Sequence, residues 1–314
     1  MKAALIHNPL GGGNRRSGAR VPDMARAAGL PVWTITHPDE LAAVLPAIAR
    51  AAPDLLIVNG GDGTVDAVVT ALRQTTTFAR EPMLALLAGG TTNMIARDVG
   101  LDGRPDRALR RVLTALASGQ PGEQIRRAPL ILRRDSGADL LGFFLGGGAL
   151  PLLLRRVHSR VHHRGFISRG GEALALLQTV WRLLWGDVRQ DPVLQPRRLH
   201  WTADGQAEEN SSMVLYFITT LDRLVLGLNP ARPAPGMRMM VLRHPYHRLV
   251  RSVIRLLRRL SFDAVGGDFI FREGQTLRLN CEGELVLDGE PVPLAAGPVE
   301  VRLALGTPLV FWRI

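Results

Sequence analysis

Three short glycine-rich segments carry the polar side chains that are best placed for chemistry. They read "NPLGGGN" at residues 8–14, "NGGDGT" at residues 59–64 and "AGGTTN" at residues 88–93. Glycine costs backbone entropy, so it normally has a local reason. One reason is a tight turn from a strand into a helix, with Asp62 or Thr64 as the helix cap. The other is phosphate binding, because N–H groups at a helix start attract anions and missing Cβ atoms allow close approach.

The elements that must position these segments alternate between strand and helix patterns. Short apolar strands alternating with helices predict an α/β domain with a parallel sheet. The three segments would then leave the carboxyl ends of the first, third and fourth strands, where such sheets bind ligands. Three glycine loops at one edge favour a nucleotide or phosphate site over three unrelated turns. The predicted strands cover residues 2–8, 31–36, 54–60 and 83–90, and the predicted helices cover about 19–28, 38–52, 64–73, from 92, and 106–117.

The pattern changes near Gln124. Short alternating or apolar runs follow, with turn residues between them, and predict an antiparallel, sandwich-like domain. We therefore expect a nucleotide-binding α/β domain at residues 1–124 and a β-rich acceptor domain at residues 125–302. The C-terminal tail, about 303–314, can return to the first domain. Helical patterns interrupt the second domain at residues 171–184 and 245–260.

Composition excludes several classes of enzyme. Lys2 is the only lysine among 39 basic residues, so the rest are arginine. P-loop proteins, protein kinases, PLP enzymes and Schiff-base aldolases all need a lysine in a particular context. Lys2 lies in none of those contexts. The net charge of +11 suggests an anionic partner.

Targeting and redox signals are weak. The longest uncharged apolar run, residues 140–154, is too short to span a bilayer and contains glycines and a proline. The apolar run at the N-terminus is too short for a signal peptide. A cytoplasmic protein is therefore expected. One cysteine, Cys281, excludes an intrachain disulfide, and its place in a predicted strand indicates a buried structural thiol.

The motifs resemble those of a known family. "NPLGGG", "GGDGT", "GGTTNMIARDVG" and a late "LDGE" resemble, in that order, the signatures of the diacylglycerol kinase catalytic superfamily. This superfamily includes bacterial lipid kinases, sphingosine kinases and ceramide kinases, and "GGDGT" also occurs in related NAD kinases. The resemblance implies ATP- and Mg²⁺-dependent phosphorylation of a lipid hydroxyl, with a diacylglycerol or a sphingoid-like lipid as the acceptor.

The resemblance also implies roles for the matching residues. Glu290 would be the general base, with Asp288 in the same motif, and Asp62 would orient groups around the metal and phosphates, with a tentative role as metal ligand. Pattern alone favours a simple hairpin turn at Asp288-Gly289. ATP would lie in the cleft between the domains, against Asn8, Pro9, Gly12, Thr36, Gly60, Gly61, Asp62, Gly63, Thr64, Gly90, Thr91 and Asn93.

Three positions depart from the family pattern. Thr92 places a β-branched side chain where the family has a small residue, and Ala67 stands where the helix after "GGDGT" usually carries an acid. Asp66 is one place early, and neighbouring helix positions point about 100° apart. Pro235 stands where an acidic turn usually holds a structural metal, so that metal is not expected. These changes leave open a divergent substrate or weak activity.

A basic amphipathic helix predicted at residues 245–260 suggests an anionic membrane surface as partner. The alternative is a helix packed on the sheet with a solvated arginine face. The prediction is therefore a peripherally membrane-associated kinase, with a homodimer left open. Alternatives are a soluble small-molecule kinase like NAD kinase, or a non-catalytic nucleotide- or lipid-binding protein. Nucleic-acid binding is disfavoured because aromatics are 5% and no recognition motif occurs. The helix carries Arg248, Arg251, Arg255, Arg258 and Arg259 towards one side.

Overall fold

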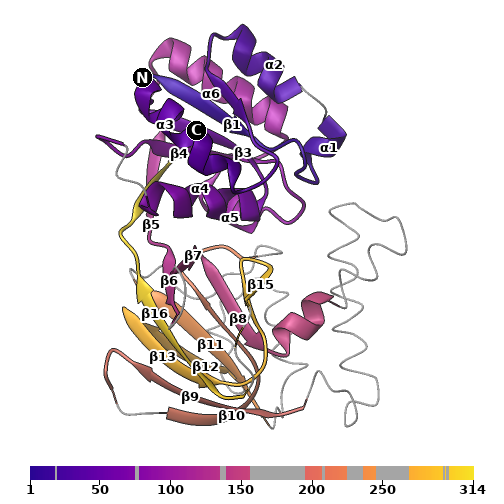
Figure 1. Cartoon of the computed structure of the whole chain (residues 1–314), viewed down its shortest axis with the longest axis vertical. Helices are drawn as coiled ribbons and strands as arrows, with labels where there is room; N and C mark the ends of the chain where they lie inside the picture. Colours follow the sequence, from indigo (N-terminus) through magenta and orange to yellow (C-terminus); the bar gives the residue numbers. More distant parts are fainter. Residues whose placement is uncertain are drawn as a thin grey trace. The chain divides into compact units, whose positions relative to one another are not determined.

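The computed structural model divides into two compact units (Figure 1). The N-terminal unit comprises Met1–Pro129 together with Thr307–Ile314, and the C-terminal unit comprises Leu130–Gly306. The structure describes residues 1–17, 20–74, 78–134, 139–155, 195–206, 209–224, 236–244, 269–292, 294 and 297–314. The predicted helices at 171–184 and 245–260, the arginines of the second helix, and Pro235 lie outside these residues.

A six-stranded sheet forms the centre of the N-terminal unit, in the order β2-β1-β3-β4-β17-β5. The first four strands pair in parallel, β17 adds to β4 in parallel, and β5 pairs with β17 in the antiparallel direction. The strands are β1 (Ala3–His7), β2 (Val32–Thr34), β3 (Leu55–Gly60), β4 (Met83–Ala88), β5 (Glu123–Arg127) and β17 (Leu309–Arg313).

Burial explains why these residues form a parallel sheet. All six residues of β3 are buried, as expected for a central strand covered on both faces. Helices α2 and α6 pack together over one face, and α3, α4 and α5 cover the other. The helices are α1 (Asn14–Ser17), α2 (Arg20–Ala27), α3 (Glu40–Ala51), α4 (Asp62–Gln74), α5 (Met94–Val99) and α6 (Pro105–Ser118).

Local signals fix the ends of the longest helix, α6. Pro105 occupies its first turn, where the missing N–H costs nothing. Gly119 ends it in the left-handed conformation with φ 66°, a typical glycine position after a helix. The four-residue helix α1, in contrast, begins at the last residue of the first glycine-rich segment, before the helix predicted at about 19–28.

The described strands of the C-terminal unit form one large antiparallel sheet. Its strand order is β15-β14-β8-β10-β9-β13-β16-β6-β7, and β10 also pairs with β11, which pairs with β12. Together with the parallel sheet of the first unit, this confirms the predicted fold class. The strands are β6 (Leu130–Arg133), β7 (Leu140–Gly142), β8 (Phe144–Gly148), β9 (Arg197–Ala203), β10 (Glu209–Thr219), β11 (Met237–Arg243), β12 (Phe269–Gly274), β13 (Thr276–Cys281), β14 (Leu285–Leu287), β15 (Glu290–Val292) and β16 (Val299–Leu305).

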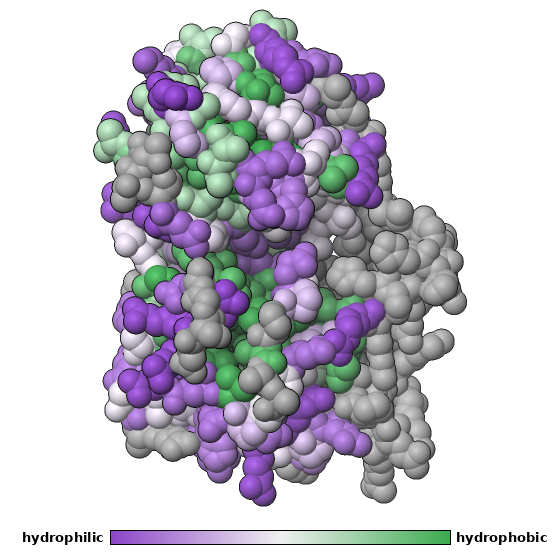
Figure 2. Space-filling view, in the orientation of Figure 1, coloured by the Kyte–Doolittle hydropathy of each residue, from purple (hydrophilic) through white to green (hydrophobic). Residues whose placement is uncertain are grey.

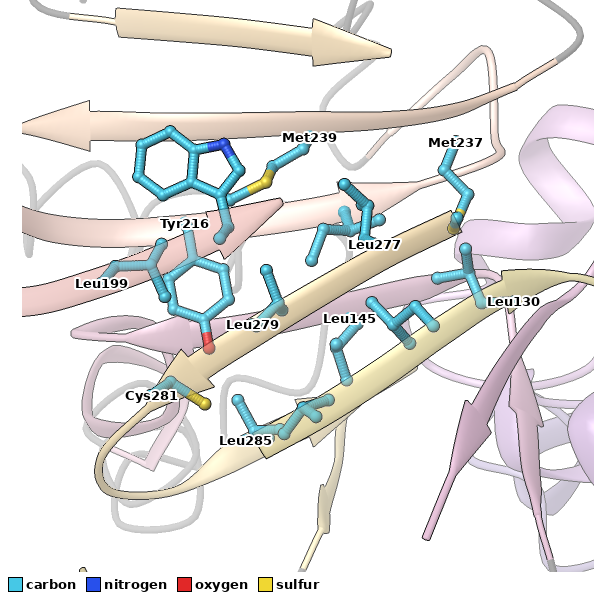
Figure 3. Packing of buried hydrophobic residues seen from close by; sticks show 14 of the residues in the cluster. Leu130, Leu145, Leu199, Tyr216, Met237, Met239, Leu277, Leu279, Cys281 and Leu285 are labelled. Atoms are coloured by element: carbon cyan, nitrogen blue, oxygen red, sulfur yellow. The ribbon is translucent and has the colours of Figure 1, made fainter. Parts of the chain in front are cut away.

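Apolar side chains from most of these strands meet in one core (Figure 3). Strand β13 shows why: buried Leu277, Leu279 and Cys281 alternate with exposed residues, as the pleat requires. Cys281 is 2% exposed, so the predicted buried thiol is confirmed. The Tyr216 hydroxyl lies near Cys281 in Figure 3, and burial raises the pKa of the Cys281 thiol.

The face shown in Figure 2 carries both hydrophilic and apolar residues. On the face shown in Figure 2, purple residues are spread over both units, with apolar atoms between them. Met1 and Leu10 are the large apolar side chains that are exposed in the described part of the chain. Among the residues that the structure describes, no helix has the length and apolar character needed to cross a membrane.

Candidate functional site at the carboxyl edge of the parallel sheet

The three glycine-rich loops meet at the carboxyl ends of β1, β3 and β4 and hydrogen-bond to one another. The N–H of Asn8 donates to the carbonyl of Asn59 over 2.9 Å. The N–H groups of Gly13 and Asn14 donate to the carbonyl of Gly89 over 2.9 and 3.0 Å, and the N–H of Gly89 donates to the carbonyl of Gly60 over 3.0 Å. The loops therefore form one backbone-bonded layer.

Most glycines in this layer are required by contacts between the loops. A Cβ on Gly90 would overlap the Cα of Gly61, which belongs to a different loop. A Cβ on Gly12 would overlap the Thr91 hydroxyl, and one on Gly60 would lie 2.5 Å from the Cβ of Thr64. The sequence interpretation explained these glycines by ligand approach. The structure shows that packing is sufficient reason for them, between loops for Gly12 and Gly90 and within the second loop for Gly60.

Gly63 is different. It is an exposed residue in the first turn of α4. Apart from its chain neighbours and the backbone of its own helix, no atom of the described residues lies within 4 Å of the position that its Cβ would take. The described fold therefore leaves open space beside the start of this helix. The unsatisfied N–H groups of a first helical turn attract anions.

Asp62 links the second loop to the third. Its Oδ2 accepts from the N–H of Met94 over 2.9 Å and its Oδ1 accepts from the N–H of Ile95 over 3.0 Å. The carboxylate thus caps α5, whose preceding residue Asn93 makes no side-chain cap of its own. Burial raises the pKa of Asp62, and the N–H donors of Met94 and Ile95 oppose that rise. In the structure, Asp62 holds two loops together.

The described residues do not form a metal cage by themselves. Within them, no three His, Cys, Asp or Glu side chains group as ligands, and both oxygens of Asp62 already accept from backbone N–H groups. Mg²⁺ usually keeps several waters and binds one or two carboxylates plus substrate phosphates. The donor set is therefore that of a site where the ion would arrive with ATP, and Asp62 is the one carboxylate within the three loops.

Other predicted residues shape the loops. The Asn8 Nδ2 donates to the Thr64 Oγ1 over 2.9 Å, which joins the first loop to α4. The Asn93 amide closes its own loop, because its Oδ1 accepts from the N–H of Gly90 over 2.7 Å and its Nδ2 donates to the carbonyl of Gly90 over 2.8 Å. Thr91 is exposed and Pro9 is half-buried.

Thr36 uses its polar groups locally. Its hydroxyl donates to the Glu40 Oε1 over 2.5 Å, and its N–H donates to the Glu40 Oε2 over 3.2 Å. These hydrogen bonds lower the pKa of Glu40 and fix the start of α3. Thr36 therefore stays at the end of β2, beside the edge that carries the three loops, with its hydroxyl already paired.

Asn14 is a site residue that the sequence analysis missed. It is 2% exposed, and its Nδ2 donates to the carbonyls of Asn8 over 2.7 Å and Asn59 over 3.2 Å. The Asn59 Nδ2 lies 2.9 Å from the His7 Nδ1, and burial lowers the pKa of His7. The only feature of the sequence that could have indicated Asn14 is its residue type, since an asparagine after a run of glycines favours the start of a helical turn.

The "LDGE" motif of the C-terminal unit forms a two-residue hairpin. Asp288 and Gly289 have φ 48° and 98°, so the pattern-based interpretation as an Asp-Gly turn is confirmed. The buried Asp288 Oδ2 accepts from the N–H of Phe143 over 2.7 Å, and its N–H donates to the carbonyl of Phe144 over 2.8 Å. Glu290 follows as the exposed first residue of β15.

The departures from the family pattern are accommodated without breaking an element. Thr92 is half-buried in the third loop. Asp66 and Ala67 both lie within α4, and both are half-buried. The helix therefore continues through the place where the family carries its acid.

Comparisons with known proteins agree with the motifs. Residues 2–119 match the model of the family described as "Diacylglycerol kinase catalytic domain". None of the curated proteins matches the chain. The match confirms, over residues 2–119, the resemblance to the diacylglycerol kinase superfamily.

Solved structures share the fold over nearly the whole chain. A diacylglycerol kinase structure from Bacillus anthracis str. Sterne has 18% identity and a TM-score of 0.65, and the match covers 100% of this chain and 96% of that one. A yeast NADH kinase complexed with NADH has 12% identity and a TM-score of 0.50, covering 100% of this chain and 84% of that one. At these identities, the likeness concerns the fold.

Proposed function

We propose that this chain transfers the terminal phosphoryl group of ATP to the hydroxyl of a lipid, with a diacylglycerol or a sphingoid-like lipid as the acceptor. The match of residues 2–119 supports a kinase. The fold shared with a diacylglycerol kinase structure supports a lipid as the acceptor. The late Asp288-Gly289-Glu290 motif in a β-rich second unit supports the same choice.

The observation that carries the proposal is the open space at Gly63. Contacts within the fold account for Gly12, Gly60 and Gly90, but no contact among the described residues accounts for a glycine at position 63. A phosphate group approaching the first turn of α4 accounts for it, because a side chain there would hinder the approach. The layer of bonded loops around it supplies a rigid frame.

Such a frame suits phosphoryl transfer. This reaction depends on positioning and charge stabilisation more than on covalent catalysis, and neither requires a lysine. Backbone N–H groups at the start of α4 would hold the phosphate oxygens. Asp62 keeps α5 and the third loop in place beside them through its bonds to Met94 and Ile95. Mg²⁺, when bound with ATP, would neutralise phosphate charge.

Glu290 is proposed as the general base that takes the proton of the acceptor hydroxyl. It is exposed, so a substrate can reach it, and it directly follows a hairpin turn that Asp288 anchors to Phe143. A positioned base of this kind contributes about 10²–10⁴-fold to a rate. In this proposal, Asp288 acts on Glu290 by fixing the turn.

A lipid acceptor implies that the protein works at a membrane surface from the cytoplasmic side. We propose that the arginines of residues 245–260 provide attraction to anionic lipid, which salt would weaken. These residues lie outside those that the structure describes, so the proposal rests on their sequence pattern alone. Cosedimentation with anionic vesicles, released by salt, is the expected result, and equal pelleting with neutral vesicles would contradict it.

The experiment that tests the function is a transfer assay. Purified protein is incubated with ATP labelled in the terminal phosphate, Mg²⁺ and a total lipid extract, and organic and aqueous phases are separated. We expect label in an organic-phase product, whose acceptor mass spectrometry would identify. A parallel reaction with NAD⁺ and NADH tests the soluble-kinase alternative that the NADH kinase fold suggests. Bound ATP without transfer to any acceptor would instead support a non-catalytic binding protein.

A further inference from the structure

We infer that Asn14 is a positioning residue of the nucleotide site, a role that rests on the proposed function. Its side chain and backbone contact the ends of all three strands that lead into the glycine loops. The Nδ2 donates to the carbonyls of Asn8 and Asn59, over 2.7 and 3.2 Å, and the N–H donates to the carbonyl of Gly89 over 3.0 Å. One residue thus fixes the loops after β1, β3 and β4 relative to one another.

The chemistry of the contacts explains why the residue is an asparagine. The groups that face its Nδ2 are two carbonyl oxygens, which need two N–H donors from one short side chain. A primary amide supplies both donors, whereas an aspartate would present acceptors to acceptors and a serine has a single donor. Because both partners are acceptors, they also fix which end of the Asn14 amide points toward them.

Asn14 is part of a buried polar chain beneath the third loop. Asn14 and Asn59 are 2% and 0% exposed, and the Oδ1 of each has no hydrogen-bond partner among the described residues. The Oδ1 atoms of Asn59 and Asn14 would lie 2.5 and 2.8 Å from a Cβ on Gly89, so both face the same glycine. With its amide oxygen and nitrogen exchanged, Asn59 would accept from the Nδ1–H of His7, and its Nδ2 would point toward Gly89 and the Asn14 side chain.

This arrangement has a functional consequence because the same three loops hold the phosphates in the proposed function. Asn14 need not contact the nucleotide. Its loss would let the first loop move relative to α4 and to the third loop. A misplacement of about 1 Å in such a frame can cost about 10²-fold in rate. The expected effect is therefore kinetic as well as structural.

The test compares two substitutions of Asn14 with a control substitution elsewhere in the same unit. Asn14→Ala removes the amide, and Asn14→Leu replaces it with an apolar side chain of similar shape. Val112→Ala, fully buried in α6, weakens the same unit without touching the loops. We expect both Asn14 variants to lower kcat/KM for ATP by about tenfold to a hundredfold, measured well below their Tm. The KM for the lipid acceptor and the activity of Val112→Ala should be unchanged.

Binding of MgATP by isothermal titration calorimetry separates this inference from the proposed function. Weaker MgATP binding by both Asn14 variants, at a folded fraction equal to that of the wild type, supports positioning. If the wild type binds MgATP and the Asn14 variants bind and turn it over equally well, despite a lower Tm, the residue is merely structural and the inference is wrong. If the wild type binds no MgATP, the proposed function fails and the inference falls with it.

Discussion

The loop layer of the N-terminal unit and the Asp288–Glu290 hairpin of the C-terminal unit hold their candidate residues in different ways. In the loop layer, backbone contacts fix the geometry, and glycines such as Gly61 and Gly90 pack against each other without side chains. In the hairpin, one side chain anchors the turn, since the Asp288 carboxylate accepts from the N–H of Phe143. The residue proposed for chemistry, Glu290, is exposed beside it.

The difference teaches which substitutions should affect the fold and which should affect chemistry. A backbone-packed layer tolerates few new atoms, so changes there should reduce stability before or together with activity. An exposed carboxylate on an anchored turn makes little contribution to folding, so its loss should remove activity alone. The two regions therefore predict separable effects.

The largest expected effect is on turnover. Glu290→Gln keeps the shape of the side chain but removes its ability to accept a proton, so lipid phosphorylation should fall by about 10²–10⁴-fold. MgATP binding and Tm should stay close to those of the wild type because Glu290 is exposed. Glu282→Gln, an exposed carboxylate of the same unit, is the matched control and should retain full activity. Normal turnover by Glu290→Gln would remove this residue from the role of base.

A smaller effect is expected from the anchor of the hairpin. Asp288→Ala leaves the buried N–H of Phe143 without this acceptor and places alanine at a positive φ, so the free energy of unfolding should fall by about 1–3 kcal/mol. Asp288→Asn keeps an acceptor and tolerates that φ, so it should recover most of the stability. Urea denaturation measures both changes.

Turnover of the same two variants distinguishes positioning from chemistry. If Asp288 positions Glu290, Asp288→Asn should be clearly more active than Asp288→Ala. Equal and complete inactivity of two well-folded variants would show that the carboxylate itself takes part in the reaction.

The smallest expected change in stability is that of Gly63→Ala, and Gly90→Ala in the same loop layer is its matched comparison. Gly90→Ala would overlap the Cα of Gly61 and should cost about 1–3 kcal/mol of unfolding free energy. Gly63→Ala meets no described atom, so stability should stay the same or rise by about 0.4–1 kcal/mol. The KM for ATP should nevertheless increase in Gly63→Ala, because its methyl group enters the space proposed for phosphate. An unchanged KM would indicate that the ligand lies elsewhere.

Much of the fold could be predicted from the sequence because its signals are local. Strand β3 is an unbroken apolar run, as a doubly covered parallel strand must be. Asp288-Gly289 is a turn pair with the positive φ values that a tight hairpin needs. Cys281 alternates with exposed residues in β13 and is buried. Each of these features depends on a few neighbouring residues.

The remaining features of the candidate site depend on contacts that the sequence does not encode locally. Asn14 reaches Asn59 across 45 positions, and Asp62 reaches Met94 across 32. Asp62 and Asn14 therefore could not be identified as the residues that join the loops. Their partners follow from the order of the strands in the sheet, which brings together loops that are far apart in the sequence.

The return of β17 to the first sheet has a consequence for synthesis on the ribosome. This strand, Leu309–Arg313, lies between β4 and β5, and Arg73 of α4 donates to the carbonyls of Thr307 and Pro308 at its entrance, over 2.8 and 3.3 Å. The nascent chain must therefore carry two open strand edges while the whole C-terminal unit is translated. Open strand edges present unpaired N–H and C=O groups that invite pairing with other chains. Completion of the six-stranded sheet is thus postponed until translation reaches these residues, and nascent chains stalled before them should be prone to aggregate.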